Sequence, residues 1–189
     1  MNLPNKLTVV RICLVPFFVF FMLADFVPHR FLYALVLFSV AAYTDHLDGQ
    51  IARSRNLITN FGKLMDPLAD KIMVMSALIC FVKLDLASTV CVIIIMFREF
   101  AVTSIRTIAV EQGQVIPANN WGKAKTVSQI IAIIVILALQ AVLAFVAAPG
   151  ELAGIFRTVS DIFMIIATIL TLISGIIYAK DSIPLFRDM

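Results

Sequence analysis

Residues 45–53 have the sequence DHLDGQIAR, and they close an apolar stretch that begins near Phe31. A glycine and two further aspartates follow, so the complete pattern is D-x2-D-G-x2-A-R-x8-G-x3-D-x3-D. Its carboxylates are Asp45, Asp48, Asp66 and Asp70. A carboxylate at membrane depth costs roughly a few kcal/mol unless it is paired, hydrated or bound to a cation. Four carboxylates between two apolar segments therefore indicate a functional site.

The composition is that of an integral membrane protein. Of the 189 residues, 61% are hydrophobic and only 14% are charged, whereas soluble domains carry about 25% charged residues. The hydrophobic residues occur in runs long enough to cross a bilayer, which takes about 20 residues. The net charge of +3 is too small to indicate a nucleic acid partner. A single membrane domain of packed helices over residues 1–189 is the simplest organisation.

We predict an all-α integral membrane protein with six transmembrane helices and a polar active-site cleft that faces the cytoplasm. The predicted helices are Leu7–Leu23, Phe31–Arg53, Pro67–Lys83, Ala87–Val110, Gly122–Val146 and Gly154–Lys180. Because cytoplasmic loops carry an excess of Lys and Arg, the more basic set of connections is expected inside. That set holds Lys6, Arg53, Arg55, Lys63, Lys123, Lys125, Lys180 and Arg187, against Arg30, Lys83 and Arg157 in the other set. Both termini are then cytoplasmic.

The predicted orientation brings polar residues from four helices to one depth. The acidic pattern ends the second helix and begins the third, while Arg98, Glu99 and Arg106 lie in the inner half of the fourth. Lys123 and Lys125 begin the fifth helix. All of these positions fall at the cytoplasmic side, which predicts a single site.

The spacing of the acidic residues favours a metal site. At 100° per residue, Asp45 and Asp48 share a helix face with Gly49 and Ala52. Asp66 precedes Pro67, which predicts an N-cap followed by proline at the first helical position. Carboxylates facing each other across a cleft repel unless cations bind, and oxygen ligands favour Mg²⁺, Mn²⁺ or Ca²⁺ over zinc. Two such ions can clamp the attacking and leaving oxygens of a phosphoryl-type displacement, with the neighbouring arginine suited to a phosphate.

With every defined position present, the pattern resembles the motif of the CDP-alcohol phosphatidyltransferase family. Further segments resemble the bacterial members that use glycerol 3-phosphate: LPNKLT at residues 3–8, REFAVT at 98–103 and GKAKT at 122–126. The resemblance implies transfer of a phosphatidyl group from CDP-diacylglycerol to sn-glycerol 3-phosphate, with release of CMP, in anionic phospholipid biosynthesis. It also implies a multi-pass protein of the bacterial inner membrane and a homodimer.

The resemblance implies a role for each matching residue. Two Mg²⁺ or Mn²⁺ ions would be bound by Asp45, Asp48, Asp66 and Asp70. Asp70 also matches the general base that acts on the acceptor hydroxyl. CDP-diacylglycerol would be contacted by Asn5, Thr8, Asp48, Gly49, Ala52 and Arg53.

The acceptor pocket is predicted from charge. Glycerol 3-phosphate is a dianion, and the cationic donors available for it are Arg98, Arg106, Lys123 and Lys125. Because Glu99 and Arg106 share a helix face, Glu99 is expected to orient Arg106 through an ion pair. Two alternatives stay open: the two lysines anchor lipid head groups, or Arg98 forms a buried structural pair with Glu99.

Other functions stay open as well. The same acidic motif would serve another acceptor, such as inositol phosphate, serine or a different alcohol. Intramembrane carboxylates also line ion and proton paths in transporters, although the outer halves of these helices are plain hydrocarbon, such as Phe31–Val40 and Ile130–Leu139. A membrane scaffold is a third class, but it leaves the acidic motif unexplained.

Overall fold

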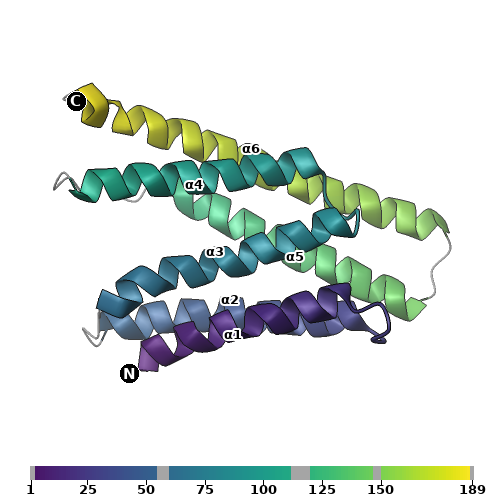
Figure 1. The fold of residues 1–189 in the computed structure, drawn as a ribbon. Coiled ribbons are helices and arrows are strands. Elements are labelled where there is room, and N and C mark those ends of the chain that lie inside the picture. Colours follow the sequence, from purple (N-terminus) through teal and green to yellow (C-terminus); the bar gives the residue numbers. More distant parts are fainter. Residues whose placement is uncertain (1–2, 55–59, 112–119, 147–149, 188–189) are drawn as a thin grey trace.

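The computed structural model describes residues 3–54, 60–111, 120–146 and 150–187. Within these ranges, the side chains of residues 3–5, 45–54, 60–64, 66, 67, 70, 111 and 183–187 lie outside the description. The described chain forms six α-helices, which confirms the all-α prediction (Figure 1). The helices are α1 (Leu3–Leu23), α2 (Arg30–Ser54), α3 (Asn60–Lys83), α4 (Thr89–Glu111), α5 (Asn120–Val146) and α6 (Gly150–Arg187).

The start of α3 corrects one prediction. The helix begins at Asn60 rather than at Pro67, so Asp66 lies inside α3 and the prediction that it caps the helix is wrong. Lys63, Leu64 and Met65 come directly before Asp66, and these residue types are good helix formers. Proline is also tolerated inside membrane helices, where neighbouring groups satisfy the freed carbonyl, and α1 likewise continues through Pro16. The α6 helix extends beyond its predicted range at both ends.

Successive helices run back and forth roughly along one axis, and both termini lie at the same end of the bundle (Figure 1). In the same view, α1, α2 and α3 lie together on one side, and α4 and α6 on the other. The α5 helix joins the two groups because it packs against both α2 and α6. The last turns of α2 and α4 and the first turns of α3 and α5 are at the same end as the termini, where the acidic motif lies (Figure 1).

One hydrophobic core takes residues from every helix, among them Phe18, Phe38, Phe81, Ile95, Ile136 and Met164. The outer surface is also apolar, with exposed side chains such as Phe17, Phe97, Ile155 and Ile169. A surface of this kind suits contact with lipid rather than water.

Three helical segments of the described chain are long and apolar enough to cross a membrane: Lys6–Leu23, Asn120–Val146 and Gly150–Ser182. Within the described residues, the apolar part of α2 covers Arg30–Thr44.

The turn after α3 is fixed by backbone hydrogen bonds. The Leu86 N–H donates to the Phe81 carbonyl at 2.8 Å, and the Asp85 N–H donates to the Val82 carbonyl at 3.1 Å. This pair of bonds is a Schellman motif, and Asp85 lies in the left-handed region at a φ of 56°. The Asp85 carboxylate accepts hydrogen bonds of 3.0 and 3.2 Å from Arg157. The turn at this end is therefore tied to α6.

Candidate active site

The acidic motif lies on two helices that contact each other, α2 and α3. Asp45 and Asp48 are one turn apart on α2, and Asp66 and Asp70 are one turn apart on α3. Their side chains lie outside the description. The same holds for Gly49 and for the side chains of Asn5, Ala52 and Arg53. Among the described side chains, no group of three or more His, Cys, Asp or Glu residues could hold a metal ion. The metal and nucleotide contacts predicted for these positions stay predictions.

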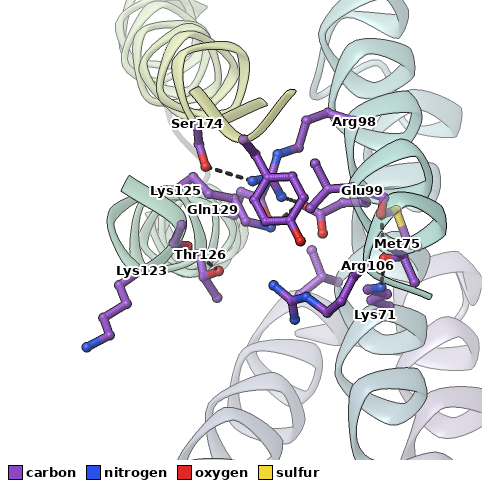
Figure 2. Close-up of a pocket in the computed structure, with 15 residues that line it drawn as sticks. Lys71, Met75, Arg98, Glu99, Arg106, Lys123, Lys125, Thr126, Gln129 and Ser174 are labelled. Carbon is purple, nitrogen blue, oxygen red and sulfur yellow. Dashed lines mark hydrogen bonds and ion pairs between the residues drawn. The ribbon is translucent and has the colours of Figure 1, made fainter. Parts of the chain in front are cut away.

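All four cationic residues predicted for the acceptor line one cavity of about 380 Å³, together with other residues of α3, α4, α5 and α6 (Figure 2). This volume is within the usual range of small-molecule sites, about 300–1,000 Å³. The described lining residues are Lys71, Val74, Met75, Arg98, Glu99, Val102, Thr103, Arg106, Gly122, Lys123, Lys125, Thr126, Gln129, Ser174 and Tyr178. The helices thus bring together residues that lie more than one hundred positions apart.

A buried ion-pair cluster forms one wall of the cavity. The Lys125 ammonium donates to the Glu99 carboxylate, and Arg98 Nη1 lies 3.4 Å from the same oxygen. Arg98, Glu99 and Lys125 are 9%, 7% and 7% exposed, respectively. The Arg98–Glu99 pair that the sequence left open as an alternative is therefore present, and Lys125 is buried in a pair rather than directed to lipid head groups.

The predicted pairing of Glu99 with Arg106 is wrong, because the ion pairs of Glu99 within the described chain are with Lys125 and Arg98. Residues 99 and 106 are seven positions apart, which is about 10.5 Å along a helix. Helical ion pairs form at three or four residues, so sharing a face over two turns was insufficient. The lysine that pairs with Glu99 is Lys125, which belongs to α5 and not to α4.

The other cations are more accessible. Arg106 is exposed, and its guanidinium carbon lies 5.9 Å from the centre of the Tyr178 ring. Lys123 also lines the cavity, but its side chain extends away from the other labelled cations (Figure 2). Arg106 is therefore the predicted acceptor ligand that is both exposed and close to the cluster.

Sequence reasoning missed Lys71 on α3. This residue lines the cavity, and its ammonium donates a hydrogen bond to the Thr103 hydroxyl on α4. Thr103 in turn donates to the Glu99 carbonyl at 2.7 Å. The position of Lys71 directly after Asp70 could have indicated it from the sequence, because this position is next to the acidic motif.

The cavity suits a small anion that carries hydroxyl groups. Its described lining contains five cationic residues and one carboxylate, an excess of four positive charges. The Tyr178 hydroxyl is buried and has no hydrogen-bond partner among the described residues. Buried hydroxyl groups are nearly always hydrogen-bonded, so a bound ligand is a natural partner for it.

A second, smaller cavity lies beside α1. It has a volume of about 70 Å³, and Arg11, Phe38, Met73 and Thr126 are among the residues that line it. Thr8, which the resemblance assigned to the nucleotide, is fully buried one turn before Arg11. The start of α1 therefore adds polar groups close to the helices that carry the acidic motif.

Comparison with known proteins shows the family of the chain. The CDP-alcohol phosphatidyltransferase family model matches residues 1–173. A Bacillus subtilis protein named CDP-diacylglycerol–glycerol-3-phosphate 3-phosphatidyltransferase is 42% identical over 92% of this chain and 91% of its own length. Proteins of the same name from Rickettsia felis and Treponema pallidum are 34% and 30% identical, over 95% and 99% of this chain and 94% and 92% of their own lengths. The chain belongs to the CDP-alcohol phosphatidyltransferase family.

Proposed function

We propose that this chain transfers the phosphatidyl group from CDP-diacylglycerol to sn-glycerol 3-phosphate, giving phosphatidylglycerophosphate and CMP. The observation that carries the proposal is the cationic cavity, which adjoins the acidic motif at the Asp70–Lys71 step of α3. A cavity with an excess of positive charge favours an acceptor that is itself a phosphate. The names of the relatives, which are similar over more than nine tenths of the chain, agree with this acceptor.

The reaction exchanges one phosphorus–oxygen bond for another. A hydroxyl oxygen of glycerol 3-phosphate attacks the phosphorus that carries diacylglycerol, and the bond from that phosphorus to the CMP oxygen breaks. The hydroxyl proton passes to the Asp70 carboxylate, which is the proposed general base. CMP leaves with the bonding electrons, so atoms and charge balance without an oxidant or reductant.

Divalent cations fit the proposed donor set. Asp45, Asp48, Asp66 and Asp70 offer carboxylate oxygens alone, and oxygen ligands suit Mg²⁺ or Mn²⁺. When bound, two such ions would neutralise charge on the attacking and leaving oxygens. Arg53, with Asn5, Thr8, Gly49 and Ala52, is proposed to bind the CDP group.

The acceptor phosphate is proposed to bind to Arg106 and to at least one of Lys123 and Lys125. Arg106 is exposed at the cavity, whereas Arg98 and Lys125 are buried in their pairs with Glu99. Those pairs hold the single described carboxylate of the cavity wall in a neutralised state, which removes a source of repulsion toward a dianion.

We also propose that all six helices span the bacterial inner membrane, with the cavity and both termini toward the cytoplasm. The position of both termini at one end of the bundle supports an even number of crossings. The cytoplasm is where the water-soluble glycerol 3-phosphate is available. The homodimer implied by the family resemblance stays a prediction.

The experiment is an acceptor panel with the purified protein, CDP-diacylglycerol and Mg²⁺. We expect CMP release with glycerol 3-phosphate, and little release with glycerol, serine or inositol phosphate. CMP release with serine or inositol phosphate in its place would keep the chemistry but refute the acceptor. Equal release with unphosphorylated glycerol would refute a role of the cationic cavity in acceptor recognition.

A further inference from the structure

Gly175 on α6 lies against the side chain of Arg98 on α4. A Cβ atom built on Gly175 would lie 2.9 Å from Arg98 Cγ and 3.7 Å from Arg98 Nε. Carbon atoms that are not bonded pack at about 3.5–4.0 Å. Even a single methyl group at position 175 would therefore collide with the stem of Arg98.

The collision cannot be relieved by bending the far end of the arginine. The position of Cγ is set by χ1, and helical residues have few χ1 choices. Moving Cγ thus means a different rotamer for the whole side chain, or a displacement of α6 from α4. In the present position, Arg98 Nη2 donates to the neighbouring Ser174 hydroxyl at 2.7 Å.

The position of the Arg98 side chain also affects the net charge of the cavity wall. Its guanidinium lies 3.4 Å from the Glu99 carboxylate oxygen that Lys125 also contacts. Without Arg98, Glu99 would keep one cationic partner and would present more negative charge to the cavity. A bound dianion would then be repelled.

We propose that Gly175 is a positioning residue for acceptor binding: its lack of a side chain leaves the space through which Arg98 reaches from α4 to Ser174 and Glu99. The proposal rests on the proposed function, because the acceptor phosphate is the ligand that would sense the change. It explains a glycine in the middle of α6, where alanine would be the better helix former.

The chain supplies a matched control on the same helix. A Cβ built on Gly154 would meet no atom within 4 Å, so Gly154→Ala makes the same chemical change in open space. We expect Gly175→Ala to raise the KM for glycerol 3-phosphate about tenfold or more. The KM for CDP-diacylglycerol should stay within about twofold, and Gly154→Ala should leave both constants unchanged.

A double-mutant cycle with Arg98→Ala tests the mechanism, because alanine has no Cγ for the new methyl group to strike. The acceptor KM of the double variant should match that of Arg98→Ala alone. Thermal unfolding should follow the same pattern: Gly175→Ala should lower the Tm in the wild-type background and not in the Arg98→Ala background. Equal effects of Gly175→Ala in both backgrounds, or an equal rise in KM for both substrates, would overturn the proposal.

The proposal can still be tested if Gly175→Ala fails to fold or if the proposed function fails. If Gly175→Ala does not fold, Ser174→Ala replaces it, since this change removes the Arg98 hydrogen bond without adding atoms and should raise the acceptor KM selectively. An unchanged KM in Ser174→Ala would then contradict the proposal. If the wild-type protein released no CMP with glycerol 3-phosphate, the proposed function would fail and with it the acceptor role, while the Tm cycle would still decide whether Gly175 sets the position of Arg98.

Discussion

At the scale of single residues, Asp66 and Asp85 differ in their place in the fold. Asp66 belongs to the motif shared by α2 and α3, whereas Asp85 lies in the turn at the opposite end of the bundle. We predict that Asp66→Asn lowers kcat/KM at least about 100-fold, because even the hydrogen-bond partners of metal ligands are worth about 10- to 100-fold. Asp85→Asn is the matched control and should keep wild-type activity.

Removal of the metal should abolish the activity of the wild-type protein, as Asp66→Asn should. Activity of the wild-type protein should disappear in chelator and return when Mg²⁺ or Mn²⁺ is added, because both ions suit carboxylate ligands. Circular dichroism should show that Asp66→Asn keeps the helical content. Full turnover of the wild type in metal-free buffer would contradict the metal assignment.

Arg106 is the cavity cation with the clearest predicted kinetic effect. Losing a hydrogen bond to a charged group costs about 1.5–3 kcal/mol, so Arg106→Ala should raise the acceptor KM by about 10- to 150-fold. The KM for CDP-diacylglycerol should change much less. Arg157→Ala removes an arginine at the other end of the bundle, and it should leave both constants unchanged. A selective loss of CDP-diacylglycerol binding in Arg106→Ala would refute the acceptor assignment.

At the scale of helices, the long apolar runs predicted which segments are helical but not where α3 begins. The Asp66–Pro67 step has the composition of a helix start, yet it lies within α3, because proline is also accommodated inside long membrane helices. Four basic residues were predicted at one site because the orientation puts them at one depth, and they line one cavity. The partners of Glu99 could not be predicted in the same way, because Lys125 reaches it through the packing of two different helices.

The turn between α3 and α4 gives a prediction about pH. The Arg157 guanidinium hydrogen-bonds to and attracts the Asp85 carboxylate, which holds the pKa of that carboxyl below its ordinary value. Because the pKa is lower in the folded state, the pair stabilises the fold above the ordinary Asp pKa, and this contribution is lost as the pH falls through the lowered value.

We therefore expect Asp85→Asn to lower the Tm at neutral pH, by at most about 3 °C for an exposed pair. The difference between variant and wild type should shrink as the pH falls below the ordinary Asp pKa of about 4, and vanish once the wild-type carboxyl is protonated as well. Thermal unfolding in detergent over this pH range measures the effect. A difference that grew on acidification would have the wrong sign for this ion pair.

At the scale of the whole molecule, the proposed orientation can be tested with two exposed positions at opposite ends. Ser88 lies between α3 and α4, and Asn120 begins α5 near the cavity. In a background without the three native cysteines, an impermeant thiol reagent should label Ser88→Cys in intact cells. Asn120→Cys should be labelled only after the cells are permeabilised. The reverse pattern would invert the topology and place the cavity outside.

We propose that the acidic motif and the cationic cavity act together to join glycerol 3-phosphate to a phosphatidyl group. The most direct test of this proposal is to incubate the purified protein with CDP-diacylglycerol, Mg²⁺ and glycerol 3-phosphate labelled in its phosphate. The label should enter a chloroform-soluble lipid in a one-to-one ratio with CMP, and Asp66→Asn should abolish both. CMP release without label in the lipid, or no reaction by the wild-type protein, would contradict it.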